Sequence, residues 1–497
     1  MSPLIKSLIS NLDIFNLYHD LGKENQPFFR ILELVHRAGA KYCFQWEDTG
    51  NDEWGAEYSE LYSKIHPPVP NHVLRLDFFE DIEQKQKYYG YVALRLKPIV
   101  TVIEAVICPP TMNGNHYLLC GSNYNIDCPD VNDQQKPHLL IDACPFVQQD
   151  GVIGICAHAS IRALSLLLAN KYPGLCQRLT VKDILDRVSK MPMLEGSHLP
   201  STGLRAFEIF SAIESMGTSP ILYSFVDGLE SESGLTLEQI IYPYVESSIP
   251  ILLIIETDEA AHSLLVVGHT FDRDSWWQRA ELAYFGSITP SLHWLPSFIW
   301  SPEFIIQDDN FGPYMSSPRT LLGATTKHVL IPMPPNCPIF LPGYKAESLV
   351  AGYLTTDTLS FVYQRTQIAK PWKDVLADTL IRSRRIVLRP LLATRDSYIA
   401  HLRAAKISDT LIAQLEGLDL PPWLWVVEVS SPELYSRLLK IGEVLLNPTY
   451  PVQHIISGDE PLLITRLFDT TVKGTDFQNP IITGDADPIE IISRPSF

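Results

Sequence analysis

The amino-acid sequence predicts an α+β protein. Within residues 141–340, helical periodicities come first and strand-like runs follow, an order typical of α+β domains. Residues 1–140 and 341–497 mix both patterns, and no internal repeat is present. The chain has 497 residues, 46% hydrophobic and 19% charged, as expected of a globular protein with more than one core. We therefore divide it into regions 1–140, 141–340 and 341–497.

The N-terminal region, 1–140, contains one predicted helix and two predicted strands. Apolar residues at helical spacing predict a helix at Phe28–Val35. Alternating apolar and polar residues, rich in aromatic and β-branched types, predict strands at His72–Leu76 and Tyr88–Leu96. Asn113-Gly114 predicts a turn, and the polar stretch Asn123–Gln135 predicts an exposed loop.

The middle region has four predicted helices and four predicted strands, and most of the helices come first. One helix begins near Cys156, and the others cover Thr180–Ser189, Leu204–Met216 and Leu237–Val245. The strands are Pro220–Phe225, Ile249–Ile255, His262–Val267 and Phe304–Gln307. The proline-rich stretch Pro332–Pro338 predicts a linker.

The C-terminal region, 341–497, shows no catalytic motif. Its predicted helices are Trp372–Ile381, Asp396–Ala405 and Pro432–Ile441. Its predicted strands are Ile386–Leu388, Leu424–Val429 and Leu462–Leu467.

Composition excludes several classes of function. A net charge of -18 argues against nucleic-acid binding, which needs basic patches. Eight cysteines without dense pairing spacings fit a reducing compartment. The apolar run Ile249–Ile255 is too short to span a bilayer, and the N-terminus lacks a signal-peptide pattern. We therefore expect a cytoplasmic protein without membrane or nucleic-acid partners, its oligomeric state left open.

Cys156 is the candidate nucleophile. Two glutamines and a glycine-punctuated loop lead to this cysteine, which opens an apolar-periodic run. A thiol at a helix N-terminus lies where the helix dipole favours its anion, and the thiolate is the reactive form. Gln149, with Gln148 as the alternative, could donate to an oxyanion together with the Cys156 backbone N–H.

His262 is the candidate base. His158 is closer in sequence, but two residues along a helix rotate a side chain by about 200°, so it should face away from Cys156 and serve the core or a cap. His269 lies seven residues after His262, and an unbroken strand would turn it to the opposite face.

A carboxylate to orient His262 follows in the pair Asp308-Asp309. Because adjacent strand residues point to opposite faces, we expect only one of them to reach the histidine, and we prefer Asp308. Asp309 and Asn310 would suit an Asx turn. No cofactor or metal is expected, since Cys120 and Cys128 are spaced more widely than common zinc knuckles.

Gln149, Cys156, the run from His262 to Gly268 and Asp308 occur in the order found in papain-like cysteine peptidases. The chain resembles this fold over residues 145–315, and its bacteriocin-leader peptidase branch in particular. The resemblance implies a papain-like core flanked by N- and C-terminal regions of α/β type. Two departures are a Gln149–Cys156 spacing one residue longer than in papain and Ala157 in place of an aromatic residue.

The resemblance and the residues together predict a thiol hydrolase that cleaves a peptide or isopeptide bond of a protein or peptide substrate. The flanking regions would recruit or restrict that substrate. Two alternatives remain open, because one fold hosts several reactions. The same residues could transfer the acyl group to an amine or alcohol, as transglutaminases and acyltransferases do, or the core could be a non-enzymatic interaction module.

Overall fold

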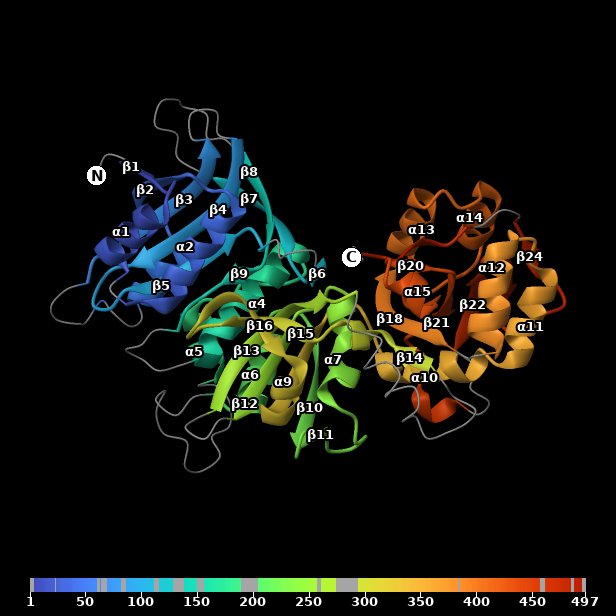
Figure 1. The fold of residues 1–497 in the computed structure, drawn as a ribbon. Coiled ribbons are helices and arrows are strands. Elements are labelled where there is room, and N and C mark those ends of the chain that lie inside the picture. Colours follow the sequence, from blue (N-terminus) through green and yellow to red (C-terminus); the bar gives the residue numbers. More distant parts are fainter. Residues whose placement is uncertain are drawn as a thin grey trace.

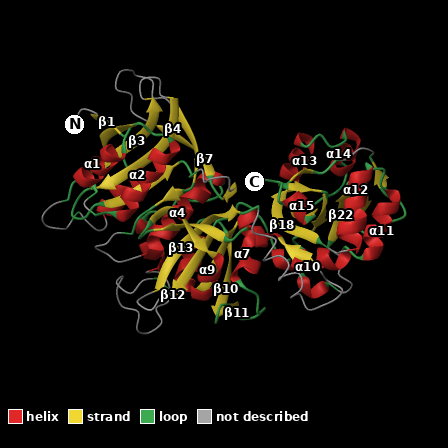
Figure 2. Ribbon diagram, viewed as in Figure 1, coloured by secondary structure: helices red, strands yellow, loops and turns green. Residues whose placement is uncertain are grey.

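Among the described residues, the computed structural model contains three large sheets that follow one another along the chain, and two further sheets of two strands each (Figure 1). Helices make up 36% and strands 35% of the structure, which confirms the α+β prediction (Figure 2). Among the described residues, no helix combines the length and apolar character that crossing a bilayer requires. The structure describes residues 4–22, 24–59, 63, 69–81, 86–110, 116–127, 138–149, 156–188, 204–256, 261–273, 294–382, 385–455, 461–483 and 487–493.

The N-terminal sheet is antiparallel and carries helix α2 (Gln26–Ala38) against one face. Asn25 caps α2 by accepting a hydrogen bond from the Phe28 amide, and Gly39 ends it at φ +115°. The predicted helix and both predicted strands of this region are confirmed. The strands, in sheet order, are β1 (Leu4–Ser7), β2 (Tyr42–Asp48), β3 (Val73–Asp81), β4 (Gln86–Arg95), β5 (Thr101–Ile107) and β9 (Pro145–Phe146); the other helices are α1 (Asn11–Leu21) and α3 (Asp52–Glu57).

The prediction of an exposed loop from Asn123 onward is wrong in its first part. Residues up to 127 form β7 (Ser122–Asp127), which pairs with β8 (His138–Ala143). Tyr124 and Ile126 alternate toward an apolar cluster while the asparagines between them point outward, so these residues form a half-buried strand. The rest of that predicted loop and the Asn113-Gly114 turn lie outside the described residues.

The middle sheet is antiparallel and is covered by helices on both faces. Along β13 (Ala261–Phe271), Leu265 and Val267 pack with α4 (Cys156–Lys171), whereas Leu264 and Val266 pack with α7 (Leu237–Glu246). All predicted elements of this region are present. The remaining ones are α5 (Val181–Val188), α6 (Ala206–Glu214), α9 (Arg319–Thr325), β6 (His116–Leu119), β10 (Ser219–Val226), β11 (Leu229–Glu230), β12 (Ile251–Glu256), β15 (Glu303–Asp308), β16 (Gly312–Pro318) and β17 (Thr326–Met333).

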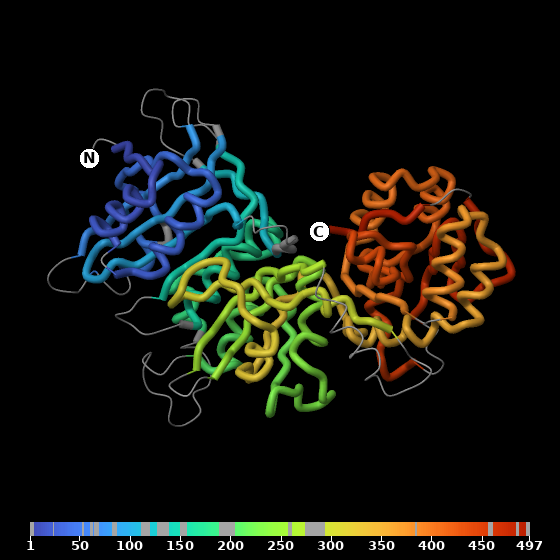
Figure 3. The backbone as a smooth tube through the Cα atoms, viewed as in Figure 1, coloured from blue at the N-terminus to red at the C-terminus, as the bar shows by residue number. Residues whose placement is uncertain are grey.

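The C-terminal sheet includes a strand from the middle region, since β14 (Trp294–Pro296) pairs in parallel with β18 (Ile386–Thr394). The backbone tube in Figure 3 shows this part of the chain, in orange and red, beyond the green and yellow middle region. The other strands of this sheet are β19 (Trp423–Ser430), β21 (Gly442–Leu446), β22 (Leu462–Leu467), β23 (Thr470–Lys473) and β24 (Ile481–Ile482). Strands β20 (Leu439–Lys440) and β25 (Ile489–Glu490) pair with each other in a separate two-stranded sheet. The helices are η3 (Ser297–Trp300), α10 (Gly343–Tyr353), α11 (Thr356–Arg365), α12 (Lys370–Asp374), η4 (Val375–Arg382), α13 (Arg395–Ala404), α14 (Asp409–Glu416), α15 (Pro432–Tyr435) and η5 (Val452–His454).

Two C-terminal predictions differ from the structure. The helix predicted to run from Pro432 to Ile441 ends at Tyr435, because Leu439 and Lys440 pair with β25. The predicted linker at Pro332–Pro338 starts inside β17, and the Cys337 side chain is buried in a core cluster that joins the middle and C-terminal regions. The division of the chain at residues 140 and 340 stays a prediction.

A chain of buried ion pairs joins α7 and β13 to the C-terminal sheet. The Arg389 guanidinium binds Glu246 of α7 and, at 2.6 Å, Glu428 of β19. Burial alone would raise the pKa of Glu246, but the charge of Arg389 lowers it below its usual range. Such a chain specifies how the two parts dock, since each buried charge needs its partner. Its members, all with side chains at most 4% exposed, are His269, Glu246, Arg389, Glu428, Lys440, Glu443 and Arg466.

We predict that Glu246→Gln destabilises the protein by about 3 kcal/mol or more, because it leaves buried positive charge under-paired. The urea-unfolding midpoint measures this effect. Asp374→Asn is the control, since it breaks the exposed pair with Lys370 and should change stability by less than about 1 kcal/mol. Equal effects of the two substitutions would show that the buried chain does not hold the two parts together.

Candidate active site

Helix α4 begins at Cys156, as predicted. Ile161, Leu164 and Leu168 are at most 1% exposed, so the helix that Cys156 opens is buried at the centre of the middle region. Residues 151–155 and the side chain of Cys156 lie outside the described part of the structure. The structure therefore places the start of the helix, and the proposed role of its thiol rests on that placement.

A hydrogen bond fastens the first turns of α4 to the strand that carries the candidate base. The Ser160 hydroxyl donates to the backbone carbonyl of Ser263 at 3.1 Å, and Ser160 is only 7% exposed. Ser160 follows Cys156 by four residues, which is about one turn of the helix. Ser263 is the neighbour of His262. This bond therefore brings the Cys156 end of α4 to the His262 end of β13.

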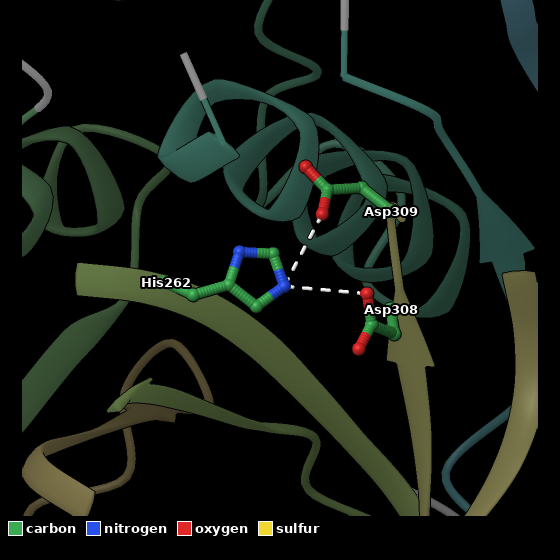
Figure 4. A group of neighbouring side chains, drawn as sticks. All are labelled: His262, Asp308 and Asp309. Carbon is green, nitrogen blue, oxygen red and sulfur yellow. Dashed lines mark hydrogen bonds and ion pairs between the residues drawn. The ribbon is translucent and has the colours of Figure 1, made fainter. Parts of the chain in front are cut away.

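His262 faces both Asp308 and Asp309. Its Nε2 atom lies 3.2 Å from Asp308 Oδ1, in a hydrogen bond, and 3.3 Å from Asp309 Oδ1 (Figure 4). The expectation that only one carboxylate would reach the histidine is wrong. β15 ends at Asp308, so Asp309 belongs to the turn before β16, where strand alternation no longer applies.

The two carboxylates differ in their surroundings. Asp308 Oδ1 also accepts a hydrogen bond from the Asn310 amide at 2.9 Å, so Asp308, rather than Asp309, makes the Asx turn. Asp309 is 4% exposed, and neither of its oxygens has a hydrogen-bond partner among the described residues. Burial, opposed by the charge of His262 and assisted by that of Asp308, raises the pKa of Asp309 to about 7.

The other two histidines considered from the sequence lie elsewhere. His269 contacts Glu246 of α7 at 3.0 Å and the Ser301 hydroxyl at 2.9 Å, on the side of the sheet away from α4. His158 is 5% exposed, and neither ring nitrogen has a hydrogen-bond partner among the described residues. Burial and then the charge of Arg162 lower the pKa of His158 to about 4. His158 is therefore a neutral histidine of the core.

The two glutamines before Cys156 contact the N-terminal region. Gln148 Oε1 accepts hydrogen bonds from Asn25 Nδ2 at 2.7 Å and from the Val102 amide at 2.9 Å. These bonds fix the glutamine segment to the start of α2 and to β5. Gln149, half-buried, has no such anchor among the described residues and lines the adjoining cleft. The choice of Gln149 over Gln148 as oxyanion donor stays a prediction.

A cleft of about 440 Å³ lies beside these residues, and the N-terminal region forms one of its walls. Asn25 was not identified from the sequence as part of the site. The sequence Asn-Gln-Pro indicates a helix cap. The contact of Asn25 with Gln148, however, joins residues 123 positions apart, and no local sequence pattern indicates it. The cleft is lined by Glu24, Asn25, Gln26, Pro27, Ile99, Val100, Thr101, Gln148, Gln149, Asp309 and Asn310.

One group of described residues has the composition of a metal site. The ligand atoms of His262, Asp308 and Asp309 all lie within 4.8 Å of one another. Cys120 belongs to no such group, since it is buried with its Sγ near the Val245 carbonyl, and Cys128 lies outside the described residues.

We predict that His158 makes the protein sensitive to acid. Its pKa is lower in the folded chain, so its stabilising contribution is present above pH 6.5 and is lost as the pH falls toward 4. Between pH 7.5 and pH 5 the wild type should lose about 2 kcal/mol more than His158→Phe. Urea unfolding at both pH values tests this, with His72→Phe, at a half-exposed position, as the control that should behave like the wild type.

No family model and no curated protein matches this chain. Among solved structures, the chain is similar to the peptidase domain of Streptococcus ComA, a bi-functional ABC transporter involved in a quorum sensing pathway. The match has 12% sequence identity and a TM-score of 0.23, and it covers 38% of this chain and 97% of that domain.

Proposed function

We propose that this protein is a thiol hydrolase that cleaves a peptide or isopeptide bond. Cys156 is the nucleophile, His262 the acid and base, Asp308 the residue that orients His262, and Gln149 a donor to the oxyanion. The substrate is a protein or peptide, and the site of action is the cytoplasm.

The reaction proceeds through a thioester. The Cys156 thiol gives its proton to His262 Nδ1, and the sulfur attacks the carbonyl carbon, whose oxygen becomes an oxyanion held by Gln149 and the Cys156 N–H. The carbon–nitrogen bond then breaks, and His262 returns the proton to the leaving amine. Water, deprotonated by His262, attacks the thioester and releases a carboxylic acid and the thiol.

The observation that carries this proposal is the bond between His262 Nε2 and Asp308 at 3.2 Å. The bond occupies one ring nitrogen, and the other, Nδ1, points away from both carboxylates (Figure 4). A carboxylate on one nitrogen stabilises the imidazolium that forms when the other takes a proton. The bond between Ser160 and Ser263 supports the pairing with Cys156, because it ties the two elements together.

Acyl transfer to an amine is the competing reaction, because it shares the thioester and differs only in the acceptor. Product mass separates the two reactions in a defined peptide library incubated with and without added glycine amide. Cleaved peptides with a free carboxylate in both incubations support hydrolysis. Products that appear only with glycine amide, and that carry it, would establish transfer. Absence of any product that depends on Cys156 would contradict both and favour an interaction module.

We predict that Cys156 is the most reactive cysteine in the folded protein. Burial raises the pKa of the Cys108 thiol to about 12 and that of Cys176 to about 11, so both are poor nucleophiles at neutral pH. Limited iodoacetamide labelling at pH 7, followed by peptide mass spectrometry, should modify Cys156 first. Denatured protein is the control, in which all eight cysteines should react alike. Modification of another cysteine with Cys156 untouched would refute the assignment.

We predict that Cys156→Ala and His262→Ala are non-additive. Each should remove most of the turnover, and the double variant should be little worse, because the two residues act as one unit. Asp308→Ala should cost less than either but more than Asp309→Ala, since Asp308 makes the hydrogen bond to His262. Turnover of the peptide library, with folding checked by far-UV circular dichroism, measures this order. A larger loss in Asp309→Ala would transfer the orienting role to that residue.

A further inference from the structure

The site holds one carboxylate more than a thiol mechanism uses. Asp308 already orients His262 and receives a second hydrogen bond from the Asn310 amide. Asp309 points at the same nitrogen of His262 as Asp308 does (Figure 4). Neither oxygen of Asp309 has a hydrogen bond of normal geometry in the described part of the structure, and so poorly satisfied a buried carboxylate is costly.

Two of the three ligand separations around His262 Nε2 match those of a tetrahedral metal site. Zinc bonds to imidazole nitrogen and carboxylate oxygen measure about 2.0–2.1 Å, which places two ligand atoms of a tetrahedron about 3.3 Å apart. The distances from Nε2 to the two carboxylate oxygens are 3.2 and 3.3 Å. All three ligand atoms lie within 4.8 Å of one another.

The ligand types favour zinc over the commoner hard cations. Calcium and magnesium prefer oxygen ligands, six or more of them, and magnesium keeps several waters. One imidazole and two carboxylates match the three-ligand sites in which zinc retains a fourth, open position. The side chains are 15%, 11% and 3% exposed for His262, Asp308 and Asp309, so the ion would be partly shielded and still reachable.

We propose that His262, Asp308 and Asp309 form a Zn²⁺ site, and that the bound ion inhibits the thiol hydrolase. The inhibitory part rests on the proposed function. With zinc on Nε2, a neutral imidazole carries its proton on Nδ1, so it has no lone pair to accept the proton of a thiol. Zinc would also bind Asp308, which could then no longer orient His262. Zinc and the thiolate–imidazolium pair are therefore mutually exclusive states of one site.

The test uses the full-length protein, freed of metal by chelator and dialysis. Calorimetric titration with Zn²⁺ should show one ion per chain. The rate of Cys156 labelling by iodoacetamide at pH 7 should fall at least tenfold at saturation. Asp309→Asn preserves the shape of the side chain and removes its charge. It should weaken zinc binding by more than the roughly 10–100-fold that loss of an outer-shell partner costs. Asp396→Asn, at a side chain 89% exposed, is the matched control and should bind zinc like the wild type.

A second variant separates this site from zinc binding by the thiol. Cys156→Ala should keep its zinc affinity if the ligands are the histidine and two carboxylates. Loss of binding in Cys156→Ala, or wild-type affinity in a folded Asp309→Asn variant, would overturn the proposal. If Asp309→Asn does not fold by circular dichroism, Asp308→Asn takes its place with the same expectation.

Failure of the proposed function gives a different result. If Cys156 does not label in metal-free protein while one zinc still binds through Asp309, the metal site stands and the thiol mechanism falls. If zinc-loaded Cys156→Ala hydrolyses peptides, the ion is catalytic, and its proposed inhibitory role is refuted together with the thiol mechanism.

Discussion

The antiparallel pairing of β13 with β15 is the constraint on which the candidate site depends. It aligns Leu265 with Gln307 and brings the start of one strand to the end of the other. His262 and the two aspartates lie 46 and 47 residues apart in sequence, and only this pairing makes them neighbours. Both strands are buried on two faces, so a slip of one residue would move every core side chain to the wrong side. The buried core therefore fixes the register of β13 against β15, and that register keeps His262 beside the two aspartates.

The start of helix α4 is anchored to β13 by one polar contact within an otherwise apolar interface. Ser160 is the anchor, and its bond to the Ser263 carbonyl is worth about 1 kcal/mol in stability. The bond also fixes the position of the first turns of α4 against β13. The N-terminal region acts similarly on the glutamine segment through Asn25 and Val102. Three elements distant in sequence therefore converge on one end of the middle sheet.

Most of the helices and strands could be predicted because local sequence patterns determine them. The alternation of Leu264–Val267 and the cap of α2 each reflect short-range rules, and the middle-region elements follow from them. The predictions failed where long-range contacts decide. Leu439 and Lys440 are strand residues because β25 is there to pair with them. Asp309 reaches His262 because β15 ends one residue earlier, which the strand pattern Phe304–Gln307 does not reveal. Asn25 and Gln148 form a pair that no sequence spacing indicates.

The second carboxylate also changes how the electrostatics of the site should be understood. One aspartate beside a histidine stabilises the imidazolium, but two would burden a nearby thiolate with excess negative charge. The protein can avoid this in two ways, and Asp309 allows both. At neutral pH, burial keeps part of the Asp309 population protonated, which leaves a single effective charge on His262. A divalent cation would instead neutralise both carboxylates at once, but it would also bind His262, which could then no longer act as the base. Under the two proposals, the active state requires a protonated Asp309 and no bound metal, so Asp309 would govern which state the site adopts.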